Sequence, residues 1–178
     1  MKKILLVFVA MLMLGGAQSQ VKWHTMNEAS TAKIGSKMYF VDFYTSWCGY
    51  CKKMDRETFT DPTVSKLLNK YFYPVKFNAE GNEQVTWKGK TYGPTAGQRS
   101  NVHQFASAVL GRQMGFPTFV LFSADQSVIQ AIPGYYNAHD FAIVLWYFAS
   151  GDCDKYPFDR YQQIFDKEIL PTMEKELK

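Results

Sequence analysis

The feature that most constrains the fold is a seven-residue apolar run that is followed closely by two cysteines. The run spans 38–44 (MYFVDFY) and is dense in aromatic and β-branched residues. Such a run predicts a buried strand with apolar residues on both faces. Cys48 and Cys51 come shortly after it, with two residues between them. We therefore expect a strand that leads into a cysteine pair, and a helix that begins at Cys48 and ends near Thr58.

Capping residues, turn residues and apolar periodicity divide the rest of the chain into further elements. We expect helices at 26–35, 62–70, 101–112 (capped by Asn101), 138–151 and 158–177, the last one interrupted at Pro171. We expect strands at 72–78, 118–122 and 128–132, and a hairpin that turns at 88–90. Because strands alternate with helices, a parallel core sheet with helices on both faces is predicted. The last two strands are joined by a tight turn, which predicts an antiparallel pair at the edge.

Length and composition favour a single folded domain. The chain has 178 residues, of which 47% are hydrophobic and 20% are charged, so it can bury a core of ordinary size. The net charge is +4, and no Lys/Arg-rich run marks a nucleic-acid-binding surface. We therefore expect no nucleic-acid partner.

The first 19 residues have the pattern of a cleaved secretion signal. Two lysines precede the apolar run 4–14, and the motif AQS at 17–19 is a small-x-small cleavage pattern. The apolar run is shorter than the ~20 residues that a transmembrane helix needs, although an uncleaved membrane anchor remains the alternative. Cleavage would leave 20–178 as one domain and lower the net charge from +4 to +2, because it removes two lysines and no acidic residue. We expect an exported protein, periplasmic or extracellular, without a stable membrane anchor.

The segment 41–52 (VDFYTSWCGYCK) resembles the active-site segment of the thioredoxin family, in which a strand end is followed by Trp-Cys-Gly-x-Cys-Lys. Three further stretches match that family in the expected order, namely KFN at 76–78, GFPT at 115–118 and Gly134. The resemblance implies a thioredoxin-like α/β fold, with a central mixed sheet of four to five strands flanked by helices on both faces. It also implies a cis peptide bond before Pro117.

Two parts of the chain depart from that family. The resemblance covers a core of about 22–150, within which residues 79–100 are an insertion, and 151–178 form a C-terminal helical extension. The insertion joins the C-terminal side of a strand to the next helix, which is the side where open α/β sheets place their sites. We therefore expect the insertion to border the active site, with a remote surface elaboration as the alternative.

The resemblance implies thiol–disulfide exchange, and the position of the cysteines supports it physically. The nucleophile in such an exchange is a thiolate. Cys48 lies at an expected helix N-terminus, where unpaired N–H groups and the helix dipole stabilise a negative sulfur. Cys51 lies one turn later, close enough to attack a mixed disulfide. We predict Cys48 as the nucleophile and Cys51 as the resolving thiol, with their redox-active disulfide in place of any cofactor or metal.

Two charged residues complete the predicted catalytic set. Asp42 lies within an apolar strand, so burial should raise its pKa and let it exchange protons with Cys51. A carboxylate at the strand edge, facing water, is the alternative. The resemblance places Lys76 near this carboxylate, where it could tune the pKa. The residues that the resemblance implies for substrate binding are Trp47, Gly49, Tyr50, Phe116 and Pro117.

Other uses of a cysteine pair fit this sequence poorly. A zinc site needs four ligands, and neither Cys153 nor the three histidines has zinc-finger spacing. Attachment of a c-type haem needs a His after the second cysteine, where this chain has Lys52. A purely structural disulfide is disfavoured because only two residues separate the cysteines. Cys153 is interpreted as an unpaired thiol, with an accessory or intermolecular role as the alternative.

Together these features predict a thioredoxin-like enzyme that reduces disulfide bonds of exported proteins. Its partners would be protein disulfides and, because an exported protein works in an oxidising compartment, an outside electron donor. A membrane electron carrier is the donor we expect. A disulfide oxidase or isomerase is the alternative among enzymes, and a non-catalytic thioredoxin-fold binding module is the alternative outside them.

Secretion should remove residues 1–19 and leave Gln20 as the first residue, because the cleavage motif ends at Ser19. Intact mass measurement of the exported protein tests this. An exported form that still carries Met1 or Lys2 would contradict the assignment of a cleaved signal.

Overall fold

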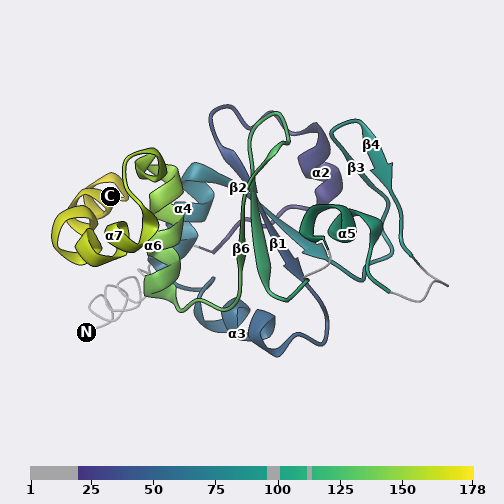
Figure 1. Cartoon of the computed structure of the whole chain (residues 1–178), viewed down its shortest axis with the longest axis horizontal. Helices are drawn as coiled ribbons and strands as arrows, with labels where there is room; N and C mark the ends of the chain where they lie inside the picture. Colours follow the sequence, from purple (N-terminus) through teal and green to yellow (C-terminus); the bar gives the residue numbers. More distant parts are fainter. Residues whose placement is uncertain (1–19, 96–100, 112–113) are drawn as a thin grey trace, which may run out of the picture.

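A computed structural model describes residues 20–95, 101–111 and 114–178. Its centre is a four-stranded sheet in the order β2-β1-β5-β6 (Figure 1). The strands are β1 (Met38–Tyr44), β2 (Phe72–Asn78), β5 (Thr118–Phe122) and β6 (Val128–Pro133). β1 and β2 are parallel, whereas β5 is antiparallel to both β1 and β6. The mixed sheet expected from the resemblance is confirmed, but the expectation of a parallel core is wrong beyond the β1–β2 pair.

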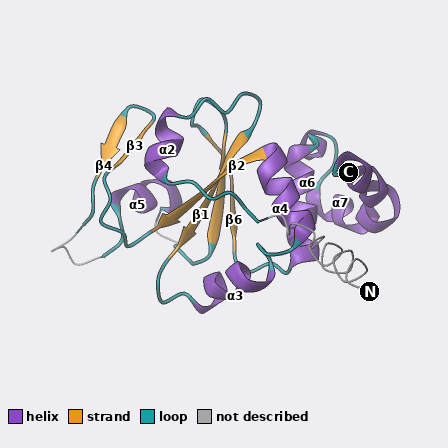
Figure 2. Cartoon of the chain, turned by 180° about the vertical axis from the view of Figure 1, so that it is seen from behind, coloured by secondary structure: helices purple, strands orange, loops and turns teal. Residues whose placement is uncertain are grey.

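Helices cover both faces of the sheet. One face carries α3, α4 and α6 together with the C-terminal helices, and the other carries α2 and α5 (Figures 1 and 2). Their bounds are α2 (Met26–Thr31), α3 (Gly49–Glu57), α4 (Pro62–Tyr71), α5 (Gln104–Leu110), α6 (Ala138–Ala149), α7 (Phe158–Ile164) and α8 (Leu170–Glu176). Among the described residues, no helix is both long enough and apolar enough to cross a membrane.

The side chains of β1 alternate between two separate apolar clusters. Phe40 packs with α3, α4 and α6, whereas Val41 and Phe43 pack with α2 and α5. Because side chains of a strand alternate between faces, Asp42 lies on the same face as Phe40, beneath α3. The parallel register pairs Asp42 with Lys76 of β2, so these two charged residues lie next to each other on that face.

The end of α2 and the start of α5 differ from those expected. Thr25 and Glu28 form a reciprocal capping box at the start of α2, but the helix ends at Thr31 because Ala32 is extended, and Gly35 lies in the following turn. The N-cap of α5 is His103, whose Nδ1 accepts the N–H of Phe105, and not Asn101. The expected end of this helix at residue 112 lies outside the described residues.

The C-terminal extension is helical, as expected, but it is not interrupted at Pro171. A wider π-helical turn, Phe165–Ile169, precedes α8, and Pro171 lies in the first turn of α8. A proline cannot donate to the carbonyl four residues earlier, and in a first turn no such bond is needed. The π turn therefore accommodates the missing N–H donor of Pro171, and the chain continues as helix beyond it.

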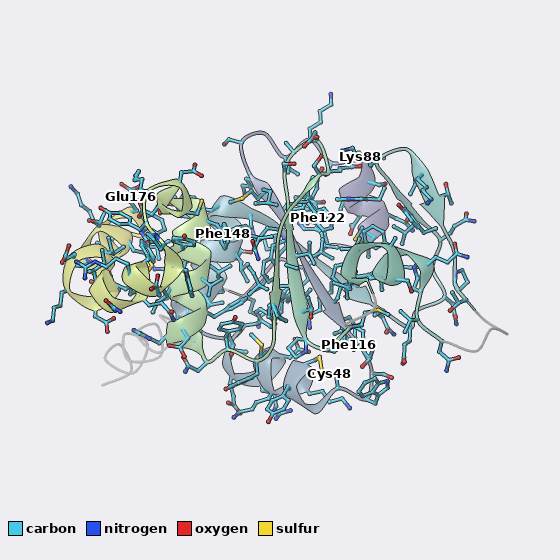
Figure 3. All side chains as sticks on the ribbon, in the orientation of Figure 1. Cys48, Lys88, Phe116, Phe122, Phe148 and Glu176 are labelled. Carbon is cyan, nitrogen blue, oxygen red and sulfur yellow. A yellow bond between two sulfur atoms is a disulfide. The ribbon has the colours of Figure 1, made fainter. Side chains whose placement is uncertain are left out.

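The insertion forms a hairpin of β3 (Val85–Trp87) and β4 (Lys90–Tyr92), which covers the edge of the α2/α5 face. The turn of the hairpin contacts the β5–β6 turn: the Lys88 N–H donates to Gln126 over 2.5 Å, and its ammonium donates to Ser127 over 2.6 Å. That turn lies at the end of the sheet opposite to the cysteine pair (Figure 3). The hairpin itself is therefore remote from the site, and the expectation that it borders the site is wrong for these residues.

Replacing Trp87 by alanine should lower the free energy of unfolding by about 3–5 kcal/mol, as large-to-small changes in a core do. Its ring is buried and contacts Tyr39, Phe105 and Phe122. Urea denaturation measures the effect, with Val128→Ala on the exposed part of β6 as the control. A loss below about 1 kcal/mol would show that the hairpin is not part of the core.

Candidate active site

Cys48 and Cys51 are placed by the start of α3 and form a disulfide bond with a Cα–Cα distance of 5.3 Å. Cys48 is the N-cap of the helix, and its Sγ accepts the backbone N–H of Cys51 over 3.0 Å. Both residues are nearly buried, with 4% and 3% of their surface exposed. The start of a nine-residue helix thus offers an N–H donor to the Cys48 sulfur, as the sequence predicts.

Aromatic side chains flank the disulfide, and two of them are largely exposed. Trp47 is 64% exposed, lies edge-on to Phe116 at 6.2 Å and donates its indole N–H to Glu80 over 2.9 Å. Tyr50 is 61% exposed and lies 5.6 Å from the ring of Tyr135. Cys48 and Phe116 lie close together at the same end of the sheet (Figure 3). Glu80, the second residue of the insertion, is where the insertion meets the site.

The loop before β5 approaches the same end of the sheet. The Phe116–Pro117 peptide bond is cis, which confirms the expectation from the sequence. The carbonyl of Pro117 accepts the N–H of Gly134 over 2.9 Å, so the start of β5 and the end of β6 are joined beside the cis bond. A Cβ added at Gly49 would meet no described atom within 4 Å, and sterics give no reason for a glycine at this position.

Asp42 is buried, with 1% of its surface exposed, which excludes the alternative of a strand-edge carboxylate facing water. Burial raises its pKa from 3.8 to about 7, although the nearby Lys76 ammonium opposes the shift. That ammonium lies 3.4 Å from Asp42 Oδ2. The other oxygen, Oδ1, has no hydrogen-bond partner among the described residues. A carboxyl group with this pKa can both accept and release a proton near neutral pH.

A second carboxylate, Asp55 of α3, contacts the same ammonium. The negative charge of Asp55 further raises the pKa of Asp42. Asp55 follows Cys51 by four residues, so both lie on one face of α3. Asp55 was not among the residues predicted from the sequence, although its spacing from Cys51 on the expected helix was the signal that could have found it. Lys76 thus links the face of α3 that carries Cys51 to the buried carboxyl of Asp42.

Three aromatic rings lie beside the Lys76 ammonium. It lies 5.1 Å from the ring centres of Trp23 and Tyr44, and 5.6 Å from that of Phe59. Such faces attract a cation and leave it little room to move. The position of Lys76 between the two carboxylates is therefore set by packing as well as by charge.

Cys153 is a free thiol in the short 3-10 segment after α6. It packs partly against the core on the α6 side, and this burial raises its pKa. A raised pKa lowers the fraction of reactive thiolate. Cys153 is thus an unpaired thiol, as interpreted from the sequence.

Replacing Asp42 by asparagine should stabilise the protein at pH 8 and have no such effect below about pH 4. Between these values the folded state holds a proton on Asp42 that the unfolded state has released, so stability falls as the pH rises through this window. A shift from 3.8 to about 7 corresponds to roughly 4 kcal/mol, which is the upper limit of the gain.

Thermal or urea unfolding of both proteins across this pH range measures the difference. Asp159→Asn, at an exposed position on α7, is the matched control. An Asp42→Asn variant that is equally or less stable than the parent protein at pH 8 would contradict the raised pKa.

Comparison with known proteins assigns the chain to a family. A family model described as a thioredoxin-like domain matches residues 26–149. A solved structure of a DsbH oxidoreductase is similar with a TM-score of 0.53 and 18% identity, over 75% of this chain and 88% of the other. A thioredoxin-fold protein from Helicobacter pylori is similar with a TM-score of 0.49 and 15% identity, over 92% of each chain. No curated protein sequence matches. The family match spans more than half of the chain, and the protein belongs to the thioredoxin-like family.

Proposed function

We propose that the protein is a thiol–disulfide oxidoreductase that reduces disulfide bonds of exported proteins. The observation that carries the proposal is the cysteine pair at the start of α3, with Cys48 Sγ accepting a helix N–H over 3.0 Å. A donor aimed at this sulfur favours its thiolate. The thioredoxin-like fold, shared with a DsbH oxidoreductase, supports the same chemistry.

In the proposed reaction, the reduced protein transfers two electrons to a substrate disulfide. The Cys48 thiolate attacks one substrate sulfur, forms a mixed disulfide and releases the other sulfur as a thiolate, which takes up a proton. The Cys51 thiolate then attacks Cys48 Sγ, re-forms the Cys48–Cys51 disulfide and releases the second substrate sulfur. An external dithiol donor must then reduce the pair again.

Asp42 acts as the proton acceptor for Cys51 in this scheme. The resolving thiol must lose its proton before it can attack. Asp42 lies beneath α3, and its pKa of about 7 lets it take up that proton at neutral pH. Lys76 holds this pKa lower than burial alone would, and Asp55 holds it higher.

The charges next to the pair support the proposed direction of exchange. A cation between the cysteines would stabilise the thiolate strongly and make the disulfide an oxidant. That position is occupied by Tyr50 and not by a cationic residue, and the Lys76 ammonium is paired with the carboxylates of Asp42 and Asp55. These features favour reduction over the alternatives of oxidation or isomerisation. In the oxidising compartment implied by the predicted secretion signal, the electron donor would be a membrane carrier.

Two cysteine variants should separate the roles of the pair. Cys48→Ser should abolish reduction of a protein disulfide, because no nucleophile remains. Cys51→Ser should accumulate a covalent mixed disulfide with the substrate, visible on non-reducing gels. In the reduced protein, limiting iodoacetamide should label Cys48 faster than Cys51, since the helix terminus stabilises the Cys48 thiolate.

Cys153→Ser is the matched control, because it removes the third thiol and should leave both turnover and trapping unchanged. Faster labelling of Cys51 would reverse the assigned roles. Turnover that survives Cys48→Ser would contradict the proposed reaction.

A further inference from the structure

The edge strand β6 and the C-terminal extension together form an apolar groove that the cysteine chemistry does not use. The groove has a volume of about 290 Å³. Its apolar lining comes from Ile132, Tyr136, Val144, Tyr147, Phe148 and Phe158. Phe158 belongs to α7, so the extension supplies one wall.

The backbone of β6 is open on the side away from β5. The N–H of Gly134 bonds to Pro117, which fixes the antiparallel ladder so that Ala131 is not hydrogen-bonded to β5. The N–H and carbonyl of Ala131 therefore point outward, and the side-chain amide of Gln130 donates to that carbonyl over 2.9 Å. Among the described strands only β5 pairs with β6. Such an edge can accept one further strand.

A short chain segment joins the groove to the candidate active site. β6 ends at Pro133, and the next residue, Gly134, bonds to the carbonyl of Pro117 over 2.9 Å. The next two residues are tyrosines with different contacts: Tyr135 contacts Tyr50 beside the disulfide, and Tyr136 lines the groove. The Thr58 hydroxyl donates to the Tyr136 carbonyl over 2.7 Å and holds this connection against the end of α3.

We propose that the β6 edge and this groove bind an extended, apolar segment of the substrate polypeptide, next to the cysteine that reacts with Cys48. An extended segment is the occupant that can both pair with the outward groups of Ala131 and insert alternate side chains into the groove. A small disulfide has no such segment. The proposal rests on the proposed function and makes unfolded polypeptides the preferred substrates.

Two variants test the groove and the edge separately. Phe158→Ala removes the wall supplied by α7. Ala131→Pro removes the outward N–H of β6 without removing a ladder bond. Tyr156→Ala is the matched control, because Tyr156 is an exposed aromatic residue of the same extension that does not line the groove. Circular dichroism and thermal unfolding establish that each variant is folded, and Phe158→Ala keeps the test valid if Ala131→Pro does not fold.

Phe158→Ala and Ala131→Pro should each reduce kcat/KM for an unfolded protein disulfide by roughly tenfold, as the loss of one central contact does. The values for oxidised glutathione, and for both substrates in Tyr156→Ala, should stay within about twofold of the parent protein. Equal losses for the two substrates, or no loss, would overturn the proposal.

Binding of an unfolded polypeptide with carboxymethylated cysteines separates this proposal from the proposed function, because no exchange can occur. Fluorescence anisotropy should show binding by the parent protein and roughly tenfold weaker binding by Phe158→Ala. Equal binding by the two proteins would contradict the proposal that the groove binds substrate, whatever their redox activity. Failure of the parent protein to reduce either disulfide would instead overturn the proposed function.

Discussion

The candidate site depends on one charge arrangement, in which the Lys76 ammonium lies between the buried carboxyl of Asp42 and the exposed carboxylate of Asp55. A carboxylate in an apolar interior is costly unless it is paired or protonated. The arrangement ties β1 and β2 to α3, and so fixes the helix face that carries Cys51. It also leaves Asp42 with a pKa of about 7, at which its carboxyl can exchange protons. Packing of Trp23 and Phe59 around the ammonium joins this charge pattern to the core.

Much of this arrangement could be predicted from the sequence. The apolar runs predicted the bounds of β1, β2 and β5, because short stretches rich in aromatic and β-branched residues favour a buried strand. The expected starts of the helices at 62 and 138 are confirmed, because the preceding residues, Asp61 and Asn137, accept helix N–H groups with their side chains. Burial of Asp42 followed from its apolar neighbours.

Other features depend on tertiary contacts that no local pattern encodes. β5 is antiparallel because the chain after β2 returns to the end of the sheet at which β1 and β2 end, and β5 begins there. The alternation of strands and helices does not specify this return. His103 was missed as an N-cap because histidine is not among the usual capping residues. The outward groups of Ala131 depend on the register of β5 and β6, and one wall of the groove depends on α7, which packs there only in the folded protein. The extension thus gives the site a surface that the cysteine motif alone does not predict.

The reduction potential of the Cys48–Cys51 pair tests the central claim most directly. It can be measured by equilibration with glutathione redox buffers and trapping of the free thiols, in the Cys153→Ser background. Because Tyr50 and no cationic residue lies between the cysteines, and the Lys76 ammonium is paired with two carboxylates, we expect a potential near that of thioredoxin, roughly −270 mV. A value above about −150 mV would mark a strong oxidant and contradict the assignment of this protein as a reductase.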